Sequence, residues 1–527
     1  MPYCFFSFLF LPLLFLFQGC DRKVEPPRDH QAVLRISAEG DPQSLDPRQA
    51  RDLASTTYLH LLYEGLTRAG INGQPIPALA ESITFDPESQ TYTFTLRAAA
   101  WSDGHPVTAH DFEQTWKSTL DPDFSSPNAY QLYVIKGAQA AKEGKGALET
   151  VGVKALDERT LQVELEQPTP HFLQLTSTHF FFPVHQSLRI SKNASPEPLI
   201  SNGPFLLTEW SKNNQLSVAS NPVYWDRSSV KLDKIVFIIL DNSTALNLFH
   251  ASELEWTGSP LSTLPTDALS FLKKTHQLQI SPAAGIYLFR INTEKAPFNN
   301  VKMRQAFSLA LNRHELVEHV LQGNQEPAMR YIPPSFLENS SQFIDGNATK
   351  ARQLFEEALA DDQLTAQDFP FISVCYATGE RAHKIAQVAQ QQWKEVLGIN
   401  VDLQSCESKV FYDRIKNHDY QLGIGSWFAD FRDPISFLDV FRFKNNGTNN
   451  TQWESAQFIE LLARSSQTLD SKERNQAMAK AEKILMQEMP IIPLFYSSYN
   501  YLKNPKIKGI YFSDLGYLDF KNALIEK

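Results

Sequence analysis

The sequence predicts an α/β fold in which strands and helices are mixed along the whole chain. Short runs of β-branched and aromatic residues recur, and stretches with a helical spacing of apolar residues lie between them. In addition, residues 371–376, a helical stretch that ends at Leu397, and residues 399–403 form a βαβ pattern. Such units connect parallel strands through a right-handed crossover, so we expect a parallel sheet there.

The individual elements follow from the same periodicities. Strands are expected where apolar residues alternate or run together, at residues 33–37, 92–96, 161–165 and 234–240. Helices are expected at residues 301–321, 351–360 and 471–489, and Pro490 is expected to end the last of them. Thr108 is expected to cap a further helix, because Asp111 stands where a capping-box acid would.

The amino terminus differs from the rest of the chain. Residues 4–17 are almost entirely apolar, Gln18-Gly19-Cys20 follows, and charged residues come next. This run is too short to span a bilayer comfortably and fits an export signal. Residues 16–20 resemble a bacterial lipobox, which would make Cys20 the lipid-modified start of the mature chain. Residues 1–20 would then be a signal peptide and 21–32 a tether; a cleaved signal without lipid and an uncleaved anchor are the alternatives.

Charge narrows the classes of partner. The chain of 527 residues has a formal net charge of -10, with 42% hydrophobic and 20% charged residues, as in ordinary soluble proteins. A nucleic acid or an anionic membrane surface would need a basic face. Neither is expected as the main partner, and the membrane is expected to be reached through the N-terminal lipid only.

Cys375 and Cys406 are the two cysteines that lie outside the expected signal and lipid site, and each is near the end of a predicted strand. An oxidising compartment permits a disulfide between them. The sequence does not show whether their Cα atoms come close enough, so the pairing stays open. Without a CxxC motif or clustered histidines, no metal site and no cofactor are expected.

Several short motifs follow one another along the chain. They are SLDP (44–47), LYEGL (62–66), PALAES (77–82), YTFTLR (92–97), WSDGHPVTAHDF (101–112), NGPF (202–205), NPVYW (221–225), the pieces of residues 292–313 and WFADFRDP (427–434). Most have a structural explanation: Asn202-Gly203 is a turn signal, and Trp101, Tyr224 and Trp225 are expected to be packing aromatics. As an ordered set, the motifs resemble the peptide-binding proteins of ABC importers, solute-binding protein family 5.

The resemblance covers roughly residue 33 to the C-terminus. It implies a two-lobed periplasmic-binding-protein type II fold with an additional inserted domain, hence three domains, and a ligand buried between the lobes. The implied boundaries are 33–63, 186–284 and 494–527 for lobe I, 64–185 for the inserted domain II, and 285–493 for lobe II (domain III). The chain would cross between the lobes near Gly285 and residues 493–496, where closure would hinge.

The resemblance also implies where the ammonium group of a peptide binds. In the family this role belongs to the aspartate of a Trp-x-Ala-Asp motif, which falls on Asp430, with Asp433 as the rival. A carboxylate is the group that an ammonium needs, and a dry site strengthens the pair. Residues 426–428 (Ser426, Trp427 and Phe428) would run beside the ligand like an added strand, with Trp427 as the wall of a side-chain pocket.

The partner of the peptide carboxylate is less well defined. Just upstream of that motif, a well-known oligopeptide binder has an arginine, and this chain has Ile424. The replacements considered are Arg290, beside Tyr287, together with Arg381, His383 and Arg414. Arg51 falls where that relative has an acidic residue, so the site would be more cationic and would suit acidic or carboxylate-rich cell-wall peptides. Tyr130 completes the expected ligand contacts.

An enzyme is not expected. His314 and His319 resemble the HExxH zinc motif but stand five residues apart, about 140° apart on an α-helix. No G-x-S-x-G turn and no P-loop are present in the sequence. The resemblance instead implies a periplasmic or otherwise extracytoplasmic monomer that captures short peptides and delivers them to the permease and ATPase subunits of an ABC importer. The alternatives are a same-fold binder of a nickel complex, haem or a sugar, and a surface lipoprotein without a transport role.

Overall fold

The structure is a computed structural model that describes residues 32–190, 198–321, 325–338, 343–365, 368–445 and 447–526. Its largest sheet has the strand order β15-β14-β16-β12-β17-β11-β1-β10-β9-β8. These strands are β1 (Val33–Ala38), β8 (Phe205–Ser211), β9 (Gln215–Ser220), β10 (Lys234–Ile239), β11 (Trp256–Gly258), β12 (Gln279–Ile291), β14 (Ile372–Ala377), β15 (Val401–Cys406), β16 (Leu422–Phe428) and β17 (Ile491–Lys503), with β13 (Glu326–Pro327) beside β17.

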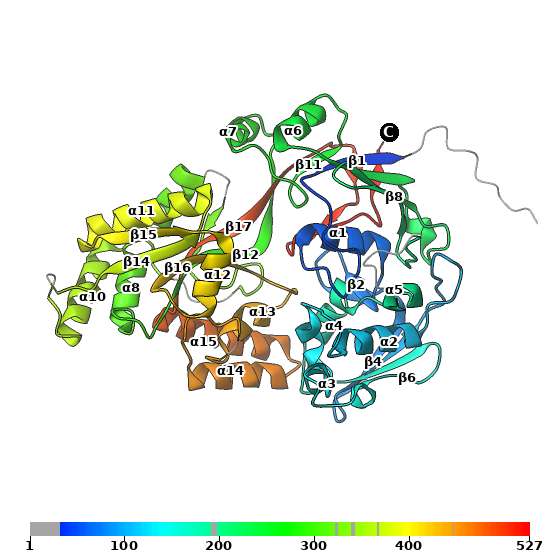
Figure 1. Ribbon diagram of the computed structural model, residues 1–527, viewed down its shortest axis with the longest axis horizontal. Helices are drawn as coiled ribbons and strands as arrows, with labels where there is room; N and C mark the ends of the chain where they lie inside the picture. The colour runs from blue at the N-terminus through cyan, green and yellow to red at the C-terminus, as the bar shows by residue number, and fades with distance from the viewer. Residues whose placement is uncertain are drawn as a thin grey trace, which may run out of the picture. The chain divides into compact units, whose positions relative to one another are not determined.

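Two long antiparallel strands, β12 and β17, run side by side through the middle of this sheet (Figure 1). Their pairing is irregular between Pro282 and Ile286, next to Gly285. A Cβ atom at Gly285 would lie 2.4 Å from the ring of Phe428, so a larger residue here would force that ring to move. The irregularity lies at the point where the sequence predicts the chain to cross between lobes.

The buried apolar residues form two large cores. One core is drawn from residues 34–261 and 507–523, and the other from residues 284–496. The helices of the first part are α1 (Leu53–Leu62), α2 (Ala109–Leu120), α3 (Ala138–Lys142), α4 (Phe172–Leu175) and α5 (Gln186–Ile190), with α6 (Asn242–His250) and α7 (Thr266–Lys274) near a small cluster of their own. Those of the second are α8 (Val301–Leu309), α9 (Arg313–Glu315), α10 (Ala348–Asp361), α11 (Glu380–Leu397), α12 (Ser408–Lys416), α13 (Ile435–Leu438), α14 (Ala456–Gln467) and α15 (Ser471–Glu488). The predicted domain boundaries themselves stay a prediction.

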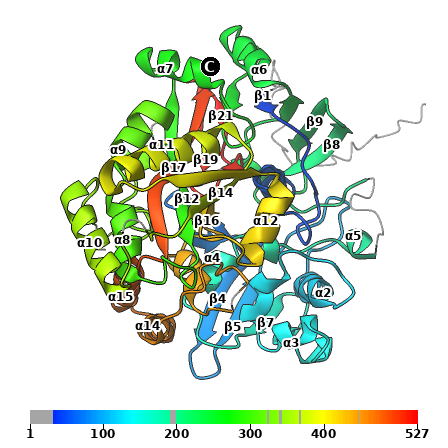
Figure 2. The ribbon, with the colours of Figure 1, turned by 60° about the vertical axis from the view of Figure 1, so that its left-hand side comes forward.

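A second sheet belongs to the expected inserted domain. It has the order β4-β5-β7-β6, with β4 (Ala80–Asp86), β5 (Thr91–Leu96), β6 (Val153–Ala155) and β7 (Thr160–Glu164). Helices α2 and α3 lie beside it in Figure 2. Helix α2 begins as predicted, because the backbone N–H of Thr108 donates to Asp111 Oδ2 at 2.9 Å. The remaining strands form short pairs: β2 (Thr67–Ala69) with β3 (Pro75–Pro77), β18 (Ile507–Lys508) with β21 (Leu524–Ile525), and β19 (Tyr511–Phe512) with β20 (Leu518–Asp519).

Most of the predicted elements are confirmed, including the βαβ unit: β14 and β15 are parallel, and α11 lies between them in the chain. The continuous helix expected at residues 301–321 is wrong. Helix α8 ends at Leu309, α9 starts anew after the N-cap Asn312, and residues 316–321 form a π-helix. The break has a physical cause: the buried Arg313 bonds the carbonyl oxygens of Ser308 and Pro493.

Cys375 and Cys406 are both free thiols. Cys375 is opposite Gln404 in the parallel register, and Cys406 is opposite Ala377, so the two cysteines are not paired residues of neighbouring strands. In the described residues, no helix is long and apolar enough to cross a membrane, and no group of three or more His, Cys, Asp or Glu side chains is placed to hold a metal ion. Cys20 and the expected signal lie outside the described residues.

Gly203 lies in the turn immediately before β8 and packs against the end of α1. Its N–H donates to Leu62 O, and the side chain of Asn202 bonds both backbone polar groups of Glu64. A Cβ atom at Gly203 would lie 2.5 Å from the carbonyl carbon of Leu62. Gly203→Ala is therefore expected to destabilise the fold by ~1–3 kcal/mol, as overpacking does, measured by urea unfolding. Gly40→Ala is the control, because nothing lies within 4 Å of its Cβ position and its φ is outside the left-handed region; equal losses would contradict the steric explanation.

Candidate binding cleft

Three neighbouring cavities surround the segment from Trp427 to Asp430. The Tyr517 cavity, of about 260 Å³, is lined by Arg51, His60, Asp430, Arg432 and Tyr517 among others. The His171 cavity, of about 470 Å³, is lined by residues that include Tyr130, His171, Trp427, Asp430 and Arg442. The Arg290 cavity, of about 260 Å³, is lined by residues that include Arg51, Arg290, Tyr331, Trp427 and Phe441.

The cavities adjoin one another, because each pair shares wall residues. Asp430 lines both the Tyr517 and the His171 cavity, Trp427 lines both the His171 and the Arg290 cavity, and Arg51 lines both the Tyr517 and the Arg290 cavity. The wall is built from segments far apart in the sequence, near residues 51, 130, 171, 290 and 430. Clefts of this kind, with apolar walls and a few charged groups, are where proteins hold small ligands.

Asp430 follows the end of β16 and is half-buried at the junction of two cavities. Its Oδ2 accepts a hydrogen bond from the hydroxyl of Tyr130 at 3.1 Å, and its backbone N–H donates to Ser436 Oγ at 3.0 Å. Burial raises the pKa of Asp430, although the hydrogen bonds from Tyr130 and Gln131 and the charge of Arg51 act in the opposite direction. The carboxylate thus sits in a site that disfavours an unpaired negative charge, and a cationic group would restore the balance.

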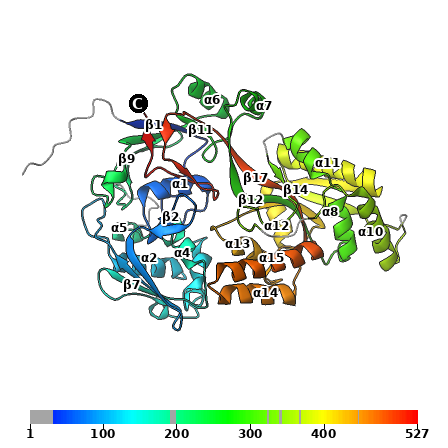
Figure 3. The same cartoon turned by 180° about the vertical axis from the view of Figure 1, so that it is seen from behind.

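The rival carboxylate, Asp433, is committed to a structural role. Both of its oxygens accept hydrogen bonds at 2.6 Å from the guanidinium of Arg474, and both side chains are buried. Oδ1 also accepts from the backbone N–H of Ile435 at 2.9 Å. Asp433 therefore ties the start of α13 to α15, which lie side by side in Figure 3, and lines none of the three cavities.

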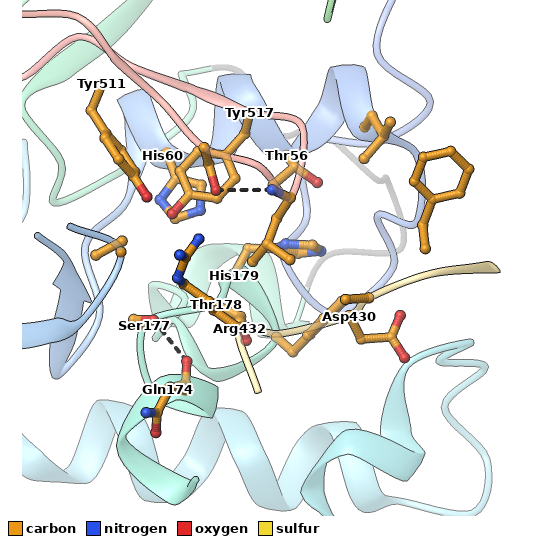
Figure 4. Close-up of a pocket in the computed structure, with 18 of the residues that line it drawn as sticks. Thr56, His60, Gln174, Ser177, Thr178, His179, Asp430, Arg432, Tyr511 and Tyr517 are labelled. Carbon is orange, nitrogen blue, oxygen red and sulfur yellow. Dashed lines mark hydrogen bonds between the residues drawn. The ribbon is translucent and has the colours of Figure 1, made fainter. Parts of the chain in front are cut away.

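The histidines of the cleft are neutral near neutral pH. The His60 ring stacks on Tyr517 with 4.0 Å between ring centroids, and burial lowers its pKa to about 3. His171 stacks on Phe431 at 4.8 Å, and burial lowers its pKa to about 4. Figure 4 shows His60 and Tyr517 at one end of the Tyr517 cavity and Asp430 at the other. Charge in the cleft therefore comes from carboxylates and arginines, not from histidine.

Strand β16 has one free edge beside this cleft. Residues 422–428 pair with β12 on one side, whereas on the other side only Leu422 and Gly423 pair with β14. In the described part of the chain, residues 424–428 thus have no strand partner on that side. Unpaired backbone N–H and C=O groups of an edge can accept an added strand.

The sequence-predicted residues separate into two groups. Asp430, Trp427, Phe428, Arg290, Arg51 and Tyr130 line at least one of the cavities. Ser426, Tyr287, Arg381 and Arg414 line none of the three. Tyr287 is opposite Ser426, and both point to the sheet face opposite Arg290 and Trp427, because side chains alternate along a strand.

The remaining candidates are engaged outside the cleft. Arg414 donates to Gln404 Oε1 at 3.0 Å and to the carbonyl oxygen of Asp419 at 3.1 Å. Exposed Arg381 lies 5.9 Å from the ring centroid of Tyr287, and His383 contacts the hydroxyl of Tyr376 at 2.7 Å. Sequence reasoning missed His60, His171, Arg432 and Tyr517; of these, only Arg432 stands in a motif, immediately after the Asp430 segment.

Comparison with known proteins places the chain among solute-binding proteins. The family model "Bacterial extracellular solute-binding proteins, family 5 Middle" matches residues 74–449, and the chain belongs to this family. It is 39% identical to the oligopeptide-binding protein OppA of Bacillus subtilis (strain 168), over 96% of this chain and 95% of the relative. It is 34% identical to the dipeptide-binding protein DppE of the same strain, over 98% and 97%.

A solved structure agrees with the fold. The murein tripeptide-binding protein MppA, in its unliganded open form, superposes with a TM-score of 0.81 and 30% identity, covering 94% of this chain and 97% of MppA. The predicted α/β class and the multi-domain periplasmic-binding-protein architecture are thus confirmed. The family is one of binding proteins of transporters rather than of enzymes.

Proposed function

We propose that the protein binds short peptides outside the cytoplasmic membrane and delivers them to an ABC importer. The position of Asp430 is the observation that carries this proposal. A half-buried carboxylate with a raised pKa lies where two cavities meet, within two residues of the free edge of β16. It suits the α-ammonium group of a peptide whose backbone extends along that edge. The names of the relatives, which bind oligopeptides, dipeptides and murein tripeptide, support the same interpretation.

The residues proposed to hold the peptide have distinct roles. Asp430 and the Tyr130 hydroxyl receive the ammonium end, the backbone of residues 424–428 pairs with the peptide backbone, and Trp427 and Phe428 wall the side-chain spaces. A protein of this kind holds the groups that all peptides share and leaves the side chains in hydrated cavities. It performs no catalysis and requires no cofactor for this task.

Native mass spectrometry of residues 21–527, expressed in bacteria and gently purified, tests the proposal. A ladder of extra masses that denaturation releases as short peptides is expected. A bare protein that free-amine and N-acetylated peptides stabilise equally little would remove the peptide assignment. A nickel complex, haem, a sugar or a non-transport role at the cell surface would then be the hypothesis to pursue.

The affinity for peptides is expected to follow a bell-shaped pH profile. Only ionised Asp430 attracts the ammonium, and because its pKa is raised above the ordinary 3.8, protonation weakens binding from a higher pH than for an exposed aspartate. On the alkaline side, the α-amino group of the ligand loses its proton near its pKa of about 7.7–8.0. Calorimetric titrations from about pH 4 to about pH 9 measure both limbs. An N-acetylated peptide is the control; an acidic limb of equal size for that ligand would exclude Asp430 as the cause.

We further propose that a lipid on Cys20 holds the protein at the outer face of the cell membrane. The lipobox-like residues 16–20 support this. Cells fed a radiolabelled fatty acid are expected to label the wild-type protein, and detergent partitioning should recover it with membranes. Cys20→Ala should abolish the label and release the protein or leave its precursor uncleaved. An unlabelled wild-type chain would point to a cleaved signal without lipid.

A further inference from the structure

The Arg290 cavity differs from the rest of the cleft in its charge. Two arginines, Arg51 and Arg290, line it, and its wall contains no aspartate and no glutamate among the described residues. The Tyr517 and His171 cavities, by contrast, both contain Asp430. The chain as a whole is acidic, with a net charge of -10. A cavity whose charged wall residues are all arginines therefore differs in charge from the chain as a whole.

The guanidinium of Arg290 is held in place without a carboxylate. Its Nη2 donates to the carbonyl oxygen of Ser426 at 2.9 Å, across the two paired strands. The neighbouring strand makes room for it: a Cβ atom at Gly425 would lie 1.5 Å from Arg290 Nη1. Gly425 therefore leaves the space that the half-buried guanidinium occupies, and a positive charge is fixed at the cavity wall.

Several interior arginines of the described residues have acidic partners. Arg313 pairs with Asp345, Arg432 with Asp514, and Arg474 with Asp433. The ion pairs within the described ranges include no partner for either Arg290 or Arg51. A guanidinium has five N–H donors, so most of the hydrogen-bonding capacity of Arg290 is left for a ligand.

Aromatic side chains form much of the remaining wall. Tyr331 and Phe441 are buried, and the half-buried Trp427 connects this cavity to the one beside Asp430. Such a wall lowers the local dielectric constant, which strengthens an arginine–carboxylate contact relative to one in water. A ligand with its ammonium at Asp430 can extend past Trp427 into this cavity.

We propose that Arg51 and Arg290 form an anion subsite that takes an acidic side chain of the bound peptide, so that the protein prefers acidic peptides to neutral ones of equal size. The inference rests on the proposed peptide-binding function and names the ligand class of one part of the cleft. The carboxylate of a glutamate or aspartate side chain is the group proposed to enter this cavity. It offers the planar pair of oxygens that a guanidinium binds through two hydrogen bonds.

Calorimetry with matched tetrapeptides tests the subsite. The peptides come in pairs: for each position after the first, one peptide has glutamate at that position and its twin has glutamine. Each peptide is made with a free and with an amidated C-terminus. If a side chain fills the subsite, one glutamate peptide is expected to bind at least about tenfold tighter than its glutamine twin. A loss of affinity on amidation of one chain length, without any preference for glutamate, would mean that the C-terminus fills the cavity and would overturn the proposed preference for acidic side chains. Equal affinities for all twins and for both termini would overturn the subsite, whereas failure of every peptide to bind would overturn the proposed function as well.

Arginine variants assign the preference to the cavity. Arg290→Gln and Arg51→Gln should each remove most of the carboxylate preference while the neutral, amidated peptides keep affinities within about threefold of wild type, and Arg290→Lys should retain part of the preference. Arg352→Gln is the matched control. Exposed Arg352 also donates to a backbone carbonyl, that of Val396, but lies on α10 and lines none of the three cavities. A full wild-type preference in both Arg51→Gln and Arg290→Gln would contradict the proposal even if one variant were poorly folded.

Discussion

Asp430→Asn is expected to lower the affinity for peptides with a free α-ammonium by at least about 100-fold, or ~3 kcal/mol. The substitution keeps the size of the side chain and an oxygen for the Tyr130 hydroxyl, 3.1 Å away in the wild type. It removes the charge and introduces an amide N–H₂ group, which cannot accept a hydrogen bond from the ammonium. Peptide affinity measured by isothermal titration calorimetry is the readout.

The fold should not suffer from this change. Because burial raises the pKa of Asp430, its charged form is disfavoured in the folded protein, and a neutral amide is expected to leave the free energy of unfolding unchanged or slightly higher. N-acetylation of the peptide should weaken wild-type binding strongly and Asp430→Asn binding little, as in a double-mutant cycle. Asp439→Asn, an exposed carboxylate of the same His171 cavity that is paired with Arg442, is the control and should change affinity by less than about threefold. Equal losses in the two variants would remove Asp430 from its special role.

Sequence reasoning captured the elements of the fold because local patterns determine them. The alternation at residues 33–37 and 234–240 predicted two strands, and the structure shows that they pair with each other in parallel. The long sequence separation of such pairs leaves no local signal for the pairing. The helix predicted through residues 301–321 failed for a tertiary reason, since Arg313 turns inward to bond Pro493 O, 180 residues away.

The cleft was predictable only where a motif contains its residues. Asp430 and Trp427 belong to one motif, whereas Arg51, Tyr130 and Arg290 reach the cleft from other segments. The period-two alternation of a strand is enough to separate Trp427 from Ser426, because adjacent side chains on a strand point to opposite faces. That Arg290 shares the face of Trp427 depends on the register of β12 against β16, which no local pattern specifies.

Asp433→Asn is expected to have the largest effect on stability, a loss of ~3–5 kcal/mol in the free energy of unfolding. The wild-type carboxylate makes two hydrogen bonds of 2.6 Å to Arg474, and the two residues are only 5% and 8% exposed. Asparagine would leave the guanidinium buried without a counter-charge and would place an amide N–H₂ against its donors. Urea unfolding monitored by tryptophan fluorescence measures the loss.

A double variant separates loss of the pair from loss of volume. Asp433→Leu with Arg474→Met removes both charges and should recover most of the stability lost in Asp433→Asn, since an apolar replacement leaves no buried charge behind. Glu380→Gln, which breaks the exposed pair with Lys384, should cost less than about 1 kcal/mol. If Asp433→Asn instead kept its stability and lost its peptide affinity, Asp433 and not Asp430 would be the anchor of the ammonium group. We expect the two variants to differ: Asp433→Asn should lose stability, and Asp430→Asn should lose peptide affinity. The reason is that the Asp433 carboxylate is paired with Arg474 inside the protein, whereas the Asp430 carboxylate is left for the ligand.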